Sequence, residues 1–106
     1  LFYLSITKTG SKKLIGTICL FEFSSTPKKC EIGYELLIEY QGQGIMIEAA
    51  KKIIEYANKK LGLKMIDAIT HKDNQSSTGL LVKLNFKQLE NANEENPNLI
   101  LFRLAK

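Results

Sequence analysis

Two glycines stand directly before a predicted helix in the segment EYQGQGIMIEAA, residues 39–50. Glycine costs roughly 1 kcal/mol relative to alanine inside a helix, so Gly42 and Gly44 indicate a need for bare backbone. The first N–H groups of a helix lack intrahelical partners, and the helix dipole adds about half a positive charge there. Because glycines let an anion approach these N–H groups closely, the pattern fits a phosphate-binding site.

The glycine pattern matches neither of the two standard phosphate-binding motifs. The sequence has no Gly-Lys-Ser/Thr for a nucleoside triphosphate loop, and Ile47 stands where a dinucleotide-binding fingerprint has its third glycine. A tight turn between a strand and a helix explains two glycines equally well. From the glycines alone, both interpretations stay open.

The hydrophobic pattern predicts which elements position these residues. Apolar residues alternate with polar ones in several short segments, as in strands, and recur at spacings of three and four from residue 45 onward, as in an amphipathic helix. The predicted strands span residues 2–7, 14–23, 31–38, 65–70, 87–90 and 99–104, and the predicted helices span residues 45–61 and 75–84. The order is β-β-β-α-β-α-β-β, with a parallel, right-handed crossover around the first helix.

Local signals also predict how the two helices begin and end. Gly62 is expected to stop the first helix, and Asn74 is expected to cap the start of the second. At the end of the second helix, Asn85 is expected to adopt the left-handed conformation. Phe86 would then fold back on Leu81.

Composition limits the class of protein. A chain of 106 residues with 44% hydrophobic content supports one domain, expected to span residues 1–106. We expect no membrane span, because the apolar runs are short, and no metal, because the two cysteines lack ligand spacing. Reduced cysteines favour a cytoplasmic location. The net charge of +4 comes from scattered lysines with a single arginine, Arg103, so a nucleic-acid partner is not expected, although a small anionic ligand suits the charge.

Two motifs in residues 31–86 carry a family resemblance. The segment Gln41-Gly42-Gln43-Gly44-Ile45-Met46 is similar to a Q/R-x-x-G-x-G/A acetyl-CoA loop, with Met46 in place of a small residue. A second signature, Asn-x-x-Ser…Leu-x-x-Lys-Leu-Gly-Phe, is matched by Asn74, Ser77, Leu80, Lys83, Leu84 and Phe86, with Asn85 replacing the glycine. At this spacing the two motifs together resemble the GNAT acetyltransferases, particularly the RimJ/RimL-like branch. The resemblance implies an α/β (α+β) fold with a mixed, splayed central sheet and helices on its faces.

One part of the family fold has no counterpart in this sequence. The family begins with a further strand and two helices that help to form the acceptor site, and Leu1 corresponds to the start of the family's second strand. Either a longer chain carries this β-α-α segment before Leu1 or the protein lacks it; the domain of residues 1–106 is expected to lack it. The resemblance consequently leaves the acceptor undefined.

The resemblance implies acetyl-CoA as the co-substrate. The backbone of Tyr34, Glu35 and Leu36 would pair with the pantetheine arm like an added strand, and residues 42–47 would hold the pyrophosphate. Asn74 would hold the splayed strand ends or contact the cofactor. The cofactor-binding residues implied are Tyr34, Glu35, Leu36, Gln41, Gly42, Gln43, Gly44, Ile45, Met46, Ile47, Asn74 and Ser77.

The resemblance further implies direct transfer, in which a neutral amine attacks the thioester and coenzyme A leaves as a thiolate. Asp67, Glu31 and Glu35 are the candidate bases. Asp67 is preferred because its strand splays from its neighbour in the family, and partial desolvation there would raise its pKa. Ser77 is the candidate acid, since Leu81 occupies the position of a tyrosine that many relatives use; Ser77 could equally cap its helix.

The acceptor is predicted from the weak general acid and base candidates of this site. At pH 7 an α-amine with a pKa of about 7.8 is roughly 15% neutral, whereas a lysine is below about 0.1%. The sequence therefore favours a protein N-terminus or a small amine of modest basicity. The alternative is a non-catalytic acyl-CoA-binding relative, motivated by the missing N-terminal elements and tyrosine. Assembly as a homodimer is left open.

Overall fold

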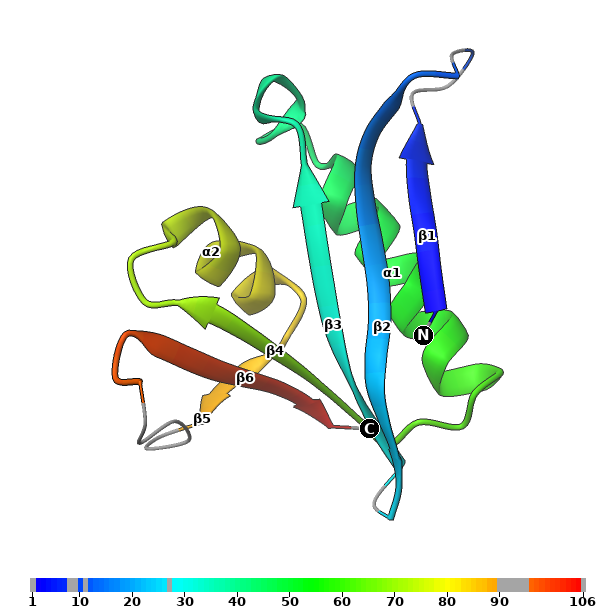
Figure 1. Cartoon of the computed structure of the whole chain (residues 1–106), viewed down its shortest axis with the longest axis vertical. Coiled ribbons are helices and arrows are strands. Elements are labelled where there is room, and N and C mark those ends of the chain that lie inside the picture. The colour runs from blue at the N-terminus through cyan, green and yellow to red at the C-terminus, as the bar shows by residue number, and fades with distance from the viewer. Residues whose placement is uncertain (1, 8–9, 11, 27, 90–95, 106) are drawn as a thin grey trace.

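The structure, a computed structural model, describes residues 2–7, 10, 12–26, 28–89 and 96–105 (Figure 1). These residues form one mixed sheet, two helices and a short 3-10 turn, in the order that the sequence predicts. Along the chain the elements are β1 (Phe2–Thr7), β2 (Leu14–Ser25), β3 (Lys28–Leu36), the 3-10 turn η1 (Ile38–Tyr40), α1 (Ile45–Lys59), β4 (Met65–His71), α2 (Gln75–Lys83), β5 (Lys87–Leu89) and β6 (Leu99–Ala105).

The sheet is splayed between its third and fourth strands. Its strand order is β1-β2-β3-β4-β6-β5, and β3 and β4 are the parallel pair, as the predicted crossover requires. These two strands pair at only three positions, from Lys29 with Met65 to Glu31 with Asp67. Beyond that point β3 and β4 diverge, and α2 lies beside the opening (Figure 1). The predicted splayed sheet is confirmed.

The core lies between the sheet and its helices. On β2, Ile18 and Leu20 are buried while the intervening Cys19 is half-buried, so one face of this strand lies in the core. Helix α1 passes behind β2 toward the lower end of β1 in Figure 1 and contributes Ala50 and Ile53 to the same core. Burying each large aliphatic side chain stabilises the fold by roughly 1.5–3 kcal/mol, which fixes the face that α1 covers.

The predicted starts of both helices are confirmed, whereas α1 ends two residues and α2 one residue earlier than predicted; the predicted cap and stop conformations are present. Gly62, with φ of 66°, follows the end of α1, and the Asn74 side chain accepts from the N–H of Ser77 at the start of α2. Asn85 has φ of 70°, and the N–H of Phe86 bonds the carbonyl of Leu81 at 2.9 Å, which is the predicted fold-back. Within the described residues, neither helix is long and apolar enough to cross a membrane.

One strand ends earlier than predicted. Ile38 was expected at the end of the third strand but lies in η1 with 81% of its surface exposed. The N–H of Leu37 still bonds the carbonyl of Ile15 at 2.8 Å, and the N–H of Tyr40 then bonds the carbonyl of Leu37 at 2.9 Å. The chain therefore leaves the sheet at Leu37 and forms the turn η1.

Candidate functional site

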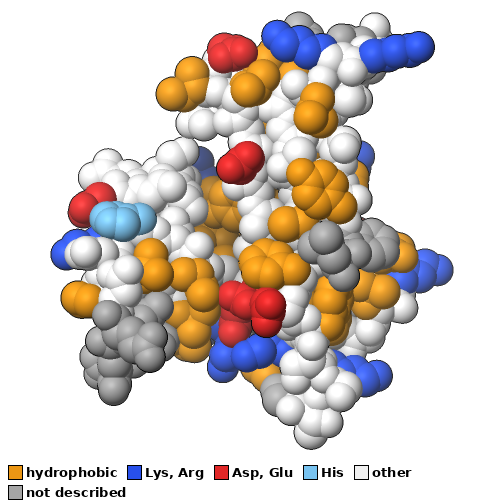
Figure 2. All heavy atoms as spheres, viewed as in Figure 1, with side chains coloured by type: hydrophobic (Ala, Val, Ile, Leu, Met, Phe, Trp, Pro, Cys, Tyr) orange, Lys and Arg blue, Asp and Glu red, His pale blue; other side chains and the backbone are white. Residues whose placement is uncertain are grey.

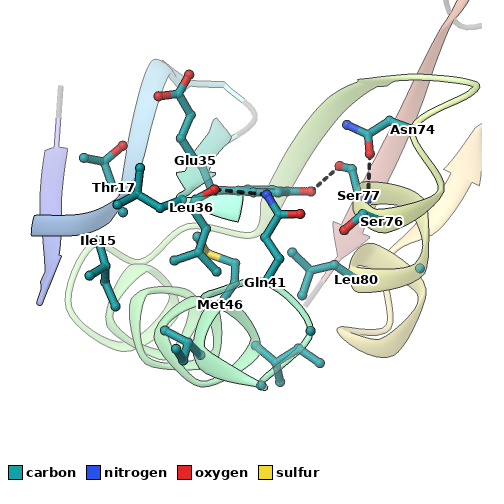
Figure 3. A pocket seen from close by; sticks show the side chains of 18 of the residues that line it. Ile15, Thr17, Glu35, Leu36, Gln41, Met46, Asn74, Ser76, Ser77 and Leu80 are labelled. Carbon is teal, nitrogen blue, oxygen red and sulfur yellow. Dashed lines mark hydrogen bonds between the residues drawn. The ribbon is translucent and has the colours of Figure 1, made fainter. Parts of the chain in front are cut away.

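A cavity of about 820 Å³ lies where β3 and β4 separate (Figure 3). Its walls are formed by the first residues of β2, the last residues of β3, the loop before α1, the first turn of α1, and α2. The structure brings together nearly all of the predicted cofactor-binding residues there: Tyr34, Glu35, Leu36, Gln41, Gly42, Gly44, Ile45, Met46, Ile47, Asn74 and Ser77. Gln43 is the exception, because its amide turns back to donate to the carbonyl of Glu39 at 3.0 Å.

The glycine loop presents free backbone donors to this cavity. Gly42 and Gly44 have φ of 76° and 77°, and Gly44 caps α1 without a side-chain hydrogen bond. The first intrahelical bond joins the N–H of Glu48 to the carbonyl of Gly44 at 3.1 Å, so the three preceding N–H groups have no helical partner. A Cβ at either glycine would meet nothing within 4 Å. The glycines are thus needed for their left-handed conformation, and the space above their backbone is open.

The edge of β3 that faces the opening is also bare. After the pair formed by Glu31 and Asp67, residues 32–36 have no partner strand on this side in the part of the chain that the structure describes. The Gln41 side chain donates to the carbonyl of Leu36 at 3.0 Å, at the far end of this edge. An unpaired strand edge offers a row of N–H and C=O groups to an extended ligand.

A hydrogen bond between two hydroxyls joins β3 to α2 beside the gap between β3 and β4. The Tyr34 phenol and the Ser77 hydroxyl lie 2.5 Å apart, and either can be the donor. Asn74 caps α2 through the backbone N–H of Ser77 at 3.1 Å, so the Ser77 hydroxyl itself is not used as a cap (Figure 3). Burial raises the pKa of Tyr34, and the hydrogen bond with Ser77 acts in the opposite direction.

Asp67 lies in a different environment from the one predicted. Its carboxylate is 4% exposed and accepts from the Nε and Nη2 of Arg103 at 2.7 and 3.0 Å, with Lys29 Nζ at 3.4 Å. Burial by itself raises the pKa of Asp67, but Arg103 and then Lys29 outweigh it and hold the pKa below its ordinary value. The predicted rise is therefore wrong, because the sheet places two cations beside this carboxylate. Asp67 also lies outside the cavity lining.

The other two candidate carboxylates lie at different ends of β3. Glu31 is opposite Asp67 and outside the cavity lining; burial raises its pKa, Glu22 and Asp67 add to the rise, and Lys29 opposes it. Glu35 lines the cavity with an exposed side chain, which extends away from Leu36 and Met46 in Figure 3. Of the three carboxylates, Glu35 alone borders the cavity.

Sequence reasoning missed the part of the wall that β2 supplies. Gly16 lies opposite Leu36 in the sheet, and a Cβ at Gly16 would come within 2.6 Å of the carbonyl of Glu35. A glycine inside an apolar strand is a signal of such close approach, and it could have indicated this contact. The further lining residues are Leu14, Ile15, Thr17, Leu37, Gln75, Ser76, Gly79, Leu80 and Lys83.

Comparison with known proteins defines the class. Residues 2–87 match the family described as acetyltransferase (GNAT) domain, so the chain belongs to the GNAT family. It is 35% identical over 83 residues to YoaA, an uncharacterized N-acetyltransferase of Bacillus subtilis (strain 168), covering 78% of this chain and 47% of YoaA. The chain thus spans about half the length of this curated relative.

Solved structures agree with this assignment. The ribosomal-protein-S5-alanine acetyltransferase from Vibrio fischeri has a TM-score of 0.83 and 27% identity, covering 97% of this chain and 60% of that one. The N-acetyltransferase PseH of Campylobacter jejuni, solved in complex with acetyl coenzyme A, shares the fold with a TM-score of 0.77 and 21% identity, covering 98% and 67%. The predicted GNAT membership and RimJ/RimL-like branch are confirmed.

Proposed function

We propose that this domain binds acetyl-CoA in the cavity between β3 and β4 and transfers the acetyl group to a primary amine by direct attack. The observation that carries the proposal is that one cavity joins three separate parts. These are the free N–H groups at the start of α1, the bare edge of β3 and the hydroxyls at the start of α2. Family membership and the acetyl-CoA complex of PseH support the same ligand.

Each part of the cavity suits a different part of acetyl-CoA. The N–H groups of Ile45, Met46 and Ile47 and the positive end of the α1 dipole would receive the pyrophosphate. The edge of β3 would pair with the amide groups of the pantetheine arm. The thioester would then lie near Tyr34 and Ser77, where α2 begins.

The transfer needs a base, an oxyanion donor and a proton for the sulfur. We assign the base to Glu35, because it borders the cavity while the charge of Asp67 is already balanced by Arg103 and Lys29. We assign stabilisation of the oxyanion to a backbone N–H on the bare edge of β3. We assign protonation of the sulfur to Ser77, whose hydroxyl lies beside Tyr34 in the wall of the cavity.

The acceptor that suits this site is an α-amine of a protein N-terminus or a small amine of modest basicity. A single exposed carboxylate is a weak base for deprotonating a strongly basic amine such as the lysine side chain. The Vibrio fischeri relative is named as a ribosomal-protein-S5-alanine acetyltransferase, which supports a protein substrate.

The test combines binding with turnover. Calorimetry with coenzyme A and acetyl-CoA should give saturable binding, and a panel of peptides with free N-termini and small amines should give release of free thiol. Tight binding without turnover on any acceptor would favour a non-catalytic acyl-CoA-binding protein. No binding of either ligand would reject the proposal.

A further inference from the structure

The hydrogen bond between Tyr34 and Ser77 crosses the opening of the sheet. Tyr34 belongs to β3 and Ser77 to the first turn of α2, and both line the cavity. The 9% exposed Ser77 has its backbone N–H held by Asn74, so its hydroxyl is directed by Tyr34. Leu81, the residue at the position of the tyrosine donor in many relatives, is buried in the core and has no proton to give.

We propose that Tyr34 and Ser77 form a hydroxyl relay in which Tyr34 is the source of the proton delivered to the sulfur of coenzyme A. This inference rests on the proposed function. It adds a second residue to the acid side of the reaction, one that reaches the cavity from the opposite wall.

The relay follows from the relative acidity of the two hydroxyls. A serine hydroxyl is a far weaker acid than a phenol, so Ser77 acting alone would leave an alkoxide behind. When the C–S bond breaks, its electron pair goes to sulfur, and an S–H bond forms with the Ser77 proton. Ser77 regains a proton from Tyr34, and the Tyr34 phenolate is reprotonated by solvent. The reaction remains amine plus acetyl-CoA giving amide plus coenzyme A thiol.

The environment of Tyr34 suits this role. Because burial raises the pKa of the phenol, Tyr34 keeps its proton across the neutral range and is always ready to donate. The bond to Ser77 also excludes the simplest alternative use of Ser77, since the N-terminal cap of α2 is already supplied by Asn74.

The relay can be tested on bound coenzyme A, with no acceptor present. The pKa of its thiol is measured from thiolate absorbance at saturating protein, after subtracting the spectrum of protein bound to desulfo-coenzyme A. Hydroxyl donors stabilise the thiolate, so Ser77→Ala should raise the thiol pKa by about one unit, a tenfold change. Tyr34→Phe should raise it by less, and the double variant should match Ser77→Ala, because the relay acts as a unit.

If the hydrogen bond between Tyr34 and Ser77 has only a structural role, the variants should behave differently. If the bond between Tyr34 and Ser77 only links β3 to α2, the variants should lose thermal stability or affinity while the thiol pKa stays at the wild-type value, and the relay is then overturned. Tyr40→Phe is the matched control, since Tyr40 lies outside the cavity lining and its ring contact with Lys13 survives the change. Failure of the wild type to bind coenzyme A would instead overturn the proposed function. Bound coenzyme A with an unshifted thiol in both variants overturns the relay alone.

Discussion

The two ends of the paired strands β3 and β4 differ in both charge and hydrogen bonding. At the closed end the strands pair, and the buried Asp67 is tied to Arg103 and Lys29. At the open end the strands separate around a cavity, and the contact across it is the uncharged bond between Tyr34 and Ser77. Figure 2 shows acidic side chains directly beside basic ones on this face of the sheet.

The difference shows why a carboxylate on the correct strand is weak evidence for catalysis. The charge of Asp67 is balanced by its neighbours, so Asp67 is held as an ion and has little tendency to take up a proton. The open end keeps backbone groups and hydroxyls that can still bind a ligand. We therefore expect changes at the closed end to act on stability, and changes at the open end to act on binding and turnover.

The largest expected effect is a loss of stability at the closed end of the strand pair. Asp67→Asn should lower the free energy of unfolding by about 3 kcal/mol at pH 7, because it leaves the Arg103 cation without its partner. The folded pKa of Asp67 lies below 3.8, so this stabilisation is present above pH 3.8 and is lost as the pH falls through the folded pKa. Urea unfolding at several pH values should show the gap between wild type and variant narrowing in acid.

The control for Asp67 is Glu55→Gln, which removes an exposed ion pair with Lys59 on α1 and should change stability little. Coenzyme A affinity should be retained in both variants. If Asp67→Asn unfolded like the wild type and lost turnover, Asp67 would return as the candidate base.

At the open end, Glu35→Gln should lower kcat/KM at pH 7 by about 100-fold if Glu35 deprotonates the amine. The deficit should shrink as the pH rises, because an α-amine with a pKa of about 7.8 then arrives neutral. Glu39→Gln, outside the cavity lining, is the matched control. A pH–rate profile that overlays the wild type would exclude Glu35 as the base.

A substitution in the glycine loop should weaken acetyl-CoA binding by a factor slightly smaller than the loss of kcat/KM expected for Glu35→Gln. Asparagine tolerates the left-handed conformation of Gly44 better than other residues with a Cβ, so Gly44→Asn keeps the turn while covering the free N–H groups. Acetyl-CoA affinity should fall about 30-fold, measured by calorimetry. Valine is a poorer choice here, because a β-branched residue is strained at φ of 77°.

Gly10→Asn provides the control for this loop. Gly10 has φ of 79° and open space above it, and it does not line the cavity. Both variants carry the same backbone strain, so their thermal stabilities should be similar. Equal acetyl-CoA affinity in the two variants would count against pyrophosphate binding at Gly44.

The smallest effect is expected when the hydrogen bond between Tyr34 and Ser77 is removed and only stability is measured. Tyr34→Phe keeps the ring and should lower the free energy of unfolding by about 1 kcal/mol, well below the loss for Asp67→Asn. Thermal unfolding of the two variants side by side gives the comparison. A loss at Tyr34 as large as that at Asp67 would mean that both ends of the strand pair are equally structural.

The sequence by itself determined the features that depend on residues close together in the chain. The left-handed Gly42 and Gly44, the Asn74 cap and the fold-back of Phe86 on Leu81 each involve residues at most five positions apart. Turn and cap conformations follow from the preferences of those few residues. The spacing of apolar residues, alternating in strands and recurring every three or four residues in helices, likewise predicted the order of the elements.

Only the tertiary structure decided which charged and polar groups meet. Asp67 and Arg103 are 36 residues apart, and Tyr34 and Ser77 are 43 residues apart. The contact between Asp67 and Arg103 depends on the register between β4 and β6, because a shift of one residue would turn each side chain to the other face of the sheet. The contact between Tyr34 and Ser77 depends on where α2 packs beside the open edge of β3. Local propensities set neither the register nor this packing. The family resemblance therefore favoured Asp67 as a base, whereas the fold places it in an ion pair with Arg103.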